Sequence, residues 1–124
     1  MKMNKFLLFL SCVGMLLSND WNFDQEFLLK KDEVVSGRVM TSGGEKALSL
    51  RWTLFKKDGL VLLLKYDHFP HQFILYKDLS RDRYILNLDQ SGDKNHLVLQ
   101  FRGFEDRRAK IWLGVQGNVD FVLN

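Results

Sequence analysis

The stretch that decides the fold is ALSLRWTL, residues 47–54. Apolar side chains occupy every second position of this stretch, and Ser49, Arg51 and Thr53 stand between them. Side chains alternate between the two faces of an extended strand, whereas a helix would scatter the same residues around its axis. The stretch is therefore predicted to be a β-strand with one buried face. The residues on that face are Leu48, Leu50, Trp52 and Leu54.

The same rhythm recurs along the chain and predicts an all-β fold. Alternating or wholly apolar runs predict further strands at 27–30, 34–40, 60–64, 73–76, 84–88, 96–102, 110–115 and 119–123. The connections are too short for the crossovers that parallel strands need. We therefore predict one antiparallel β-sandwich of about eight or nine short strands joined by tight hairpins. The alternative is a small up-and-down β-barrel.

Several short segments have the composition of turns. The segment Lys-Asp-Gly at 57–59 predicts a tight hairpin with its glycine in the left-handed conformation. Gly117 and Asn118 suit a primed two-residue turn that would join the last two strands as a hairpin. The segment Ser-Gly-Asp at 91–93 predicts another turn.

The first eighteen residues, MKMNKFLLFLSCVGMLLS, have the pattern of a secretory signal peptide. Two lysines precede an apolar run that is shorter than the roughly 20 residues needed to span a bilayer. We predict a signal peptide at 1–18, an all-β domain at 19–124, and export to the periplasm. Lipid anchoring through Cys12 is the alternative, because residues 9–12 look like a degraded lipoprotein box.

The charge pattern argues against a nucleic-acid partner. The chain has 18 basic and 15 acidic residues, a net charge of +3. Lys2 and Lys5 would leave with the signal peptide, so the exported domain would have 16 basic residues against 15 acidic ones. Charges of both signs are interspersed along the rest of the chain, which is typical of a solvated surface rather than a basic patch.

Two of the three histidines stand in KYDHFPHQFILYKD, residues 65–78. His68, His71 and a distant His96 are the candidate metal ligands, although nothing in the sequence brings His96 to the other two. Asp, His and Pro are also ordinary residues of a loop between strands, and we favour that interpretation for residues 67–72. We expect no metal and no cofactor. A metal-binding protein or a metal-dependent enzyme is kept as an alternative.

Catalytic motifs are absent from the sequence. There is no Gly-x-Ser-x-Gly elbow, and Cys12, the only cysteine, lies in the predicted signal peptide. We therefore expect the protein not to be an enzyme, and we assign no catalytic residue.

Two predicted strands, 60–64 and 73–76, are apolar on both faces. Such strands are usually central in a sheet and covered on both sides, and an uncovered second face would be adhesive. Phe55, Tyr76 and Trp112 fall opposite the regular apolar stripes of their strands, so they could form a recognition patch if exposed.

These observations predict a non-catalytic binding or accessory module of the cell envelope. Its expected partner is an envelope protein, a peptide, a glycan or a lipid, and self-association through the two-sided strands is a further expectation. A small barrel that binds a lipid or another apolar ligand is the alternative. The predicted binding residues are Asp67, His68, Phe69, His71, Ile74, Tyr76 and Trp112.

Overall fold

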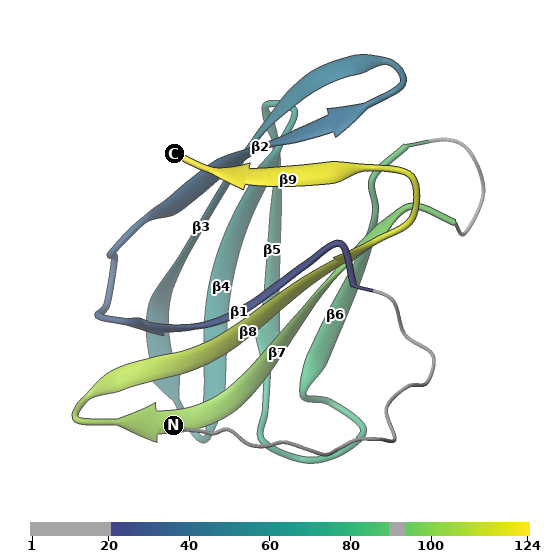
Figure 1. Ribbon diagram of the computed structural model, residues 1–124. Coiled ribbons are helices and arrows are strands. Elements are labelled where there is room, and N and C mark those ends of the chain that lie inside the picture. The colour runs from purple at the N-terminus through teal and green to yellow at the C-terminus, as the bar shows by residue number, and fades with distance from the viewer. Residues whose placement is uncertain (1–20, 90–93) are drawn as a thin grey trace, which may run out of the picture.

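The computed structural model describes residues 21–89 and 94–124, which form two antiparallel β-sheets packed against each other (Figure 1). The strands are β1 (Phe23–Leu29), β2 (Val35–Thr41), β3 (Gly44–Lys56), β4 (Gly59–Tyr66), β5 (Phe69–Leu75), β6 (Arg83–Asn87), β7 (His96–Glu105), β8 (Arg108–Gln116) and β9 (Asp120–Leu123). The predicted all-β antiparallel sandwich is confirmed. The predicted signal peptide at 1–18 and the turn at 91–93 lie outside the described residues.

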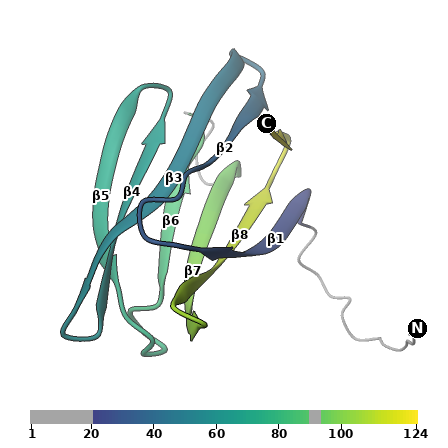
Figure 2. The ribbon, with the colours of Figure 1, turned by 90° about the vertical axis from the view of Figure 1, so that its left-hand side faces the viewer.

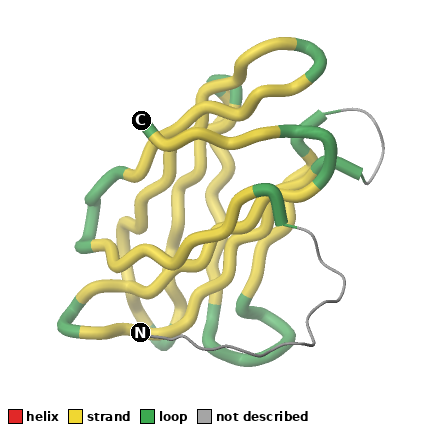
Figure 3. Tube along the Cα trace, in the orientation of Figure 1, coloured by secondary structure: helices red, strands yellow, loops and turns green. Residues whose placement is uncertain are grey.

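The strand order is β1-β8-β7-β6 in the four-stranded sheet and β5-β4-β3-β2-β9 in the five-stranded sheet. The chain passes between the sheets after β1, β5 and β8, and Figure 2 shows the two layers from the side. Each strand pairs only within its own sheet in the described part of the chain, so the architecture is a sandwich and not the alternative barrel. Short loops join the strands at both ends (Figure 3).

Inward-facing apolar side chains fill the space between the sheets. The largest fully buried side chains are Leu50, Leu60, Leu62, Leu64, Leu97, Leu99, Ile111, Leu113, Val39 and Val115. Close packing of such side chains supplies the main stabilising free energy of a domain that has no cysteine to cross-link it. Of the two faces of residues 60–64, one packs in this core, and Val61 and Leu63 on the other face point away from it and are partly exposed.

Aromatic contacts close the two open sides of the sandwich. The rings of Phe73 in β5 and Tyr84 in β6 stack with centroids 3.8 Å apart. Phe23 in β1 meets Phe121 in β9 edge to face at 4.8 Å. Each contact joins the edge strand of one sheet to the edge strand of the other, which holds the layers in register.

A β-bulge in β3 corrects the prediction for Leu54. The register of β3 against β4 shifts between Trp52 and Leu54. An extra residue in one strand moves every following side chain to the other face of the sheet. Leu48, Leu50 and Trp52 are buried as predicted, but Leu54 points outward and is 48% exposed.

The turn between β3 and β4 is tight, as predicted, but its glycine has a different role. Lys57 (φ 53°) and Asp58 (φ 65°) adopt the left-handed conformation, and Gly59 does not. A Cβ atom on Gly59 would lie 2.8 Å from Ile74 and 3.0 Å from Tyr76. Glycine is therefore needed at this position for close packing and not for its φ angle.

The interpretation of residues 67–72 as a loop is also wrong. Asp67 (φ 51°) and His68 (φ 71°) alone form a two-residue turn, and Phe69 already belongs to β5. Their positive φ angles match the primed turns that suit the twist of a hairpin. Pro70 is accommodated within β5 because β5 is an edge strand.

Gly117 does not lie in a hairpin. It follows β8 of the four-stranded sheet and leads into β9 of the five-stranded sheet, so the segment crosses between layers. Its φ of 109° is left-handed, as the sequence indicated, but β8 and β9 are not paired. A glycine-asparagine pair predicts the local backbone conformation, and it does not predict which strand comes next in the sheet.

Tyr66 of β4 links the two sheets through its hydroxyl, and removing this hydroxyl is expected to lower the free energy of unfolding measurably. Its hydroxyl donates a hydrogen bond of 2.6 Å to the carbonyl oxygen of Leu88. Tyr66→Phe leaves that carbonyl without this donor, and we expect the free energy of unfolding at pH 7 to fall by about 1–2 kcal/mol. Urea unfolding followed by circular dichroism measures the change.

The same tyrosine predicts a loss of stability in alkali. Burial, with the nearby charges of Asp67 and Asp89, raises the pKa of Tyr66 from 10.0 to about 12. The folded state holds this proton more tightly than the unfolded state does, so the stabilisation is complete below pH 10 and is lost as the pH rises towards 12. The Tyr66→Phe variant should therefore lose less stability than the parent protein between pH 10 and 12. Equal losses in the two proteins would contradict this assignment.

Candidate functional site

The strongest candidate site is an apolar row on the outer face of the five-stranded sheet. Leu54 of β3 pairs with Val61 of β4, and Val61 pairs with Ile74 of β5, so the three side chains share one face. Leu54 is 48% exposed and Ile74 is 51% exposed. Paired side chains on one face are close enough to form a continuous surface. We call these three residues the apolar row and the sheet surface around them the open face.

Tyr76 extends the apolar row beyond the end of β5. Because Gly59 has no side chain, Ile74 and the Tyr76 ring lie against the backbone of β4. Tyr76 is partly exposed and carries a hydroxyl, so it offers both apolar area and a hydrogen-bonding group. The structure thus places two of the predicted binding residues, Ile74 and Tyr76, side by side.

Cationic side chains border the apolar row. Lys56 is exposed and follows the bulge on the same face of β3. Arg51 lies on that face before the bulge, and its guanidinium is 3.1 Å from a carboxylate oxygen of Asp32. The guanidinium of Arg81 lies over the ring of Tyr76, 4.2 Å from its centroid. An apolar centre with a charged rim is the usual anatomy of a protein-binding surface.

The turn between β4 and β5 contributes Asp67 and His68 at the far end of the sheet. Lys46 Nζ lies 3.3 Å from Asp67 Oδ2. His68 lines a hollow of about 440 Å³ whose other walls include Ser49 and Lys65 of the open face. His68 is therefore accessible from the open face, whereas Asp67 is engaged by a lysine.

Phe69 and His71 point away from the open face. His71 pairs with the inward-facing Leu64, and its Nδ1 lies 3.4 Å from the hydroxyl of Tyr84 in the other sheet. Phe69 is 68% exposed on the same face as His71, at the start of β5. Of the predicted binding residues within β5, Ile74 alone lies on the open face.

Trp112 lies on the opposite side of the molecule. It stands on the outer face of the four-stranded sheet, where its ring meets that of Trp21 edge to face at 4.8 Å. Gly114 leaves room for both rings, because a Cβ atom there would be 2.4 Å from Trp112 and 2.7 Å from Trp21. The guanidinium of Arg102 lies 5.3 Å from the Trp112 ring centroid. The predicted aromatic patch is therefore wrong, since Trp112 and Tyr76 face opposite ways.

The three histidines are not brought together. His68 opens to the open face and His71 faces the other sheet, while His96 lies in β7 opposite Asn87 and Gln116. Across residues 21–89 and 94–124, no group of three or more His, Cys, Asp or Glu side chains is placed to hold a metal ion.

Asp82 is a buried carboxylate that the sequence analysis did not single out, and it is 4% exposed. It accepts hydrogen bonds from Gln100 Nε2 at 2.7 Å and from Arg83 Nε at 3.3 Å. Burial alone would raise the pKa of Asp82, but these hydrogen bonds and the charge of Arg83 bring the pKa below its ordinary value. A carboxylate held in its anionic form joins β6 to β7 and is poorly suited to general acid–base catalysis near neutral pH.

In the described part of the chain, no helix is long and apolar enough to cross a membrane. No protein-family model matches the chain, and no match was found among curated proteins or solved structures.

Proposed function

We propose that the protein is an exported, non-catalytic binding module that docks onto a protein of the cell envelope through its open face. The observation that carries the binding role is the apolar row, in which Leu54, Val61 and Ile74 lie side by side across three strands with their outer members half exposed. Export rests on the sequence of residues 1–18 alone.

A continuous exposed row has a free-energy cost that a partner would remove. Burial of apolar area contributes about 25 cal/mol per Å², so covering the row favours association. Binding free energy is usually concentrated in a few central side chains that are fully desolvated in the complex. Ile74 is the most exposed member of the apolar row and also contacts the Tyr76 side of the surface, so we expect it to bury the most apolar area in the complex. Arg51 is paired with Asp32 and Arg81 with Asp78, so Lys56 is the bordering cation that favours an acidic group at the edge of the partner's contact surface.

The experiment compares two exposed isoleucines on opposite faces. Ile74 lies in edge strand β5 on the open face, and Ile85 lies in edge strand β6 of the four-stranded sheet and is 59% exposed. The tagged full chain is purified from the periplasmic fraction, and the amount of envelope protein that co-purifies is measured. Ile74→Asp is expected to reduce this amount at least tenfold. Ile85→Asp should leave that recovery unchanged.

Both variants are first compared with the parent protein by thermal unfolding. Each substitution replaces a surface side chain, so the midpoints should change little. Equal recovery from the two variants, or a loss caused by Ile85→Asp alone, would refute the proposed surface. If the captured protein is a second copy of this chain, the open face mediates self-association and not docking onto an envelope protein.

A further inference from the structure

A second hollow lies at the end of the sandwich beside the β3–β4 and β7–β8 turns. Its volume is about 450 Å³, and it is lined by Trp52, Leu54, Phe55, Phe104, Lys31 and Arg107. All six lining residues are apolar or cationic. We call this space the aromatic hollow.

Two bulges build the aromatic hollow, one in each sheet. The first lies in β3 between Trp52 and Leu54, and the second lies in β7 between Phe101 and Phe104. Each bulge moves the side chains that follow it to the other face. Phe55 and Phe104 consequently point between the ends of the two sheets, where their rings meet edge to face at 4.7 Å.

The walls of the hollow are held firmly, although one of them is open to solvent. Trp52 meets Phe104 edge to face at 5.6 Å, and its indole Nε1 donates a hydrogen bond of 2.8 Å to the carbonyl oxygen of Leu29. Phe55 faces inward and is nevertheless 41% exposed. The hollow is therefore a shallow depression with an apolar aromatic wall, and small-molecule sites are mostly lined by apolar and aromatic side chains.

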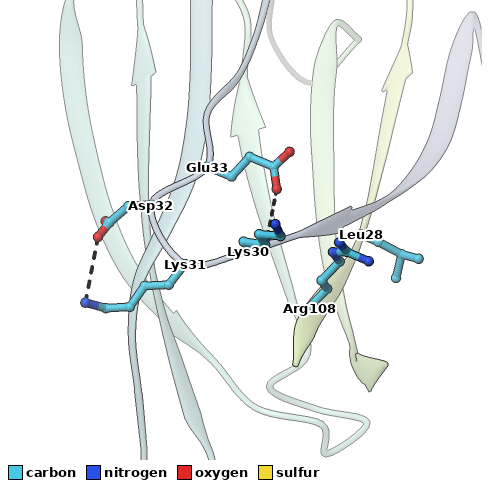
Figure 4. A pocket seen from close by; sticks show the side chains of 6 residues that line it. All are labelled: Leu28, Lys30, Lys31, Asp32, Glu33 and Arg108. Carbon is cyan, nitrogen blue, oxygen red and sulfur yellow. Dashed lines mark hydrogen bonds and ion pairs between the residues drawn. The ribbon is translucent and has the colours of Figure 1, made fainter. Parts of the chain in front are cut away.

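The rim of the hollow is positively charged. Arg107 lies in the β7–β8 turn with a φ of 65° and lines the hollow. Lys31 lies 3.7 Å from Asp32, but the same carboxylate group also contacts Arg51 at 3.1 Å. Figure 4 shows the adjoining turn, in which the Glu33 carboxylate is turned to the backbone N–H of Lys30 and away from Lys31. The Asp32 carboxylate is thus shared between two cations, and the Glu33 carboxylate is directed away from Lys31.

The geometry points to a binding site for a small organic anion that carries an aromatic group. The aromatic part would lie against Phe55 and Phe104, since aromatic rings pack favourably edge to face or offset. Its carboxylate or sulfonate would lie at the rim between Lys31 and Arg107, because charge-assisted hydrogen bonds to lysine and arginine are the strong ones. This site shares Leu54 with the apolar row, but it does not depend on the proposed docking role, because its ring wall and charged rim come from other residues.

The test uses 8-anilinonaphthalene-1-sulfonate as an anionic probe and N-phenyl-1-naphthylamine as its neutral analogue. The full chain is expected to bind one equivalent of the sulfonate, measured by fluorescence and calorimetry. The double variant Lys31→Gln, Arg107→Asn should weaken the sulfonate about tenfold and leave the neutral probe unaffected. Asparagine is chosen because it tolerates a positive φ angle.

Two further variants separate the ring wall from general charge effects. Phe55→Ser should weaken the binding of both probes about tenfold. If Phe55→Ser has a lower thermal unfolding midpoint than the parent protein, Phe55→Leu is used in its place. Lys65→Gln with Lys94→Gln removes the same charge elsewhere on the surface and should change neither affinity. The proposal is overturned if the sulfonate binds equally to both double variants, if neither Phe55 variant weakens the probes, or if several equivalents bind. Ile74→Asp should keep full probe affinity, so failure of the docking surface is distinguishable from failure of this site.

Discussion

Leu62→Ala is expected to lower the free energy of unfolding by about 2–5 kcal/mol, whereas Leu63→Ala lowers it by less than about 1 kcal/mol. The two leucines are neighbours in β4 and identical in chemistry. Leu62 is fully buried between the sheets, and Leu63 points to the open face and is partly exposed. Truncating the first leaves a cavity in a close-packed core, while truncating the second removes a few surface contacts. Denaturant unfolding of both variants in one buffer gives the comparison.

This pair also tests the premise of the proposed docking surface. Similar large losses for Leu62→Ala and Leu63→Ala would mean that the outer face of β4 is covered in the folded protein. The open face would then be part of a core, and a role for Ile74 in binding would have no basis. Similar small losses would contradict the two-layer packing itself.

Gly117→Ala is expected to cost at least about 3 kcal/mol of folding stability. The φ of Gly117 is 109°, which L side chains rarely adopt. A Cβ atom there would also lie 2.1 Å from Asn95 Oδ1 and 2.4 Å from the carbonyl oxygen of Lys94. Asn95 Oδ1 accepts the backbone hydrogen bond of Asn118 at 2.7 Å, so the substitution disturbs the crossing from β8 to β9 as well.

Gly43→Ala is the matched control for Gly117→Ala. Gly43 lies in the β2–β3 turn, and its nearest neighbour to an added Cβ atom would be Thr41 Oγ1 at an ordinary 3.7 Å. Gly43→Ala should change the free energy of unfolding by no more than about 0.5 kcal/mol. Thermal midpoints measured side by side give the result, and a small effect at both positions would contradict the close backbone approach at residue 117.

Strand positions and core residues were predictable because the alternation of side chains is a local property of an extended backbone. Leu50, Leu99 and Ile111 are buried as the pattern indicated. Leu54 was mispredicted because a bulge reverses the alternation of side chains. Residues 53–55 contain no glycine or proline that would indicate a bulge.

The candidate site was predictable only in part. Ile74 and Tyr76 were both named as binding residues, and they lie side by side because both belong to, or directly follow, a single hairpin. Trp112 was wrongly grouped with Tyr76 because its face depends on which sheet β8 joins, and strand pairing is a long-range property. The aromatic hollow escaped prediction for the same reason, as it needs one bulge in each sheet at the same end.

Pro70 has a consequence for how copies of this chain behave at high concentration. It sits in β5, a border strand of the five-stranded sheet, and has no amide hydrogen to offer a neighbour. A strand added along β5 would lack one backbone hydrogen bond at Pro70, which disfavours edge-to-edge polymerisation into fibrils at that edge. The protein can thus keep an exposed apolar row on its open face without polymerising through the β5 edge.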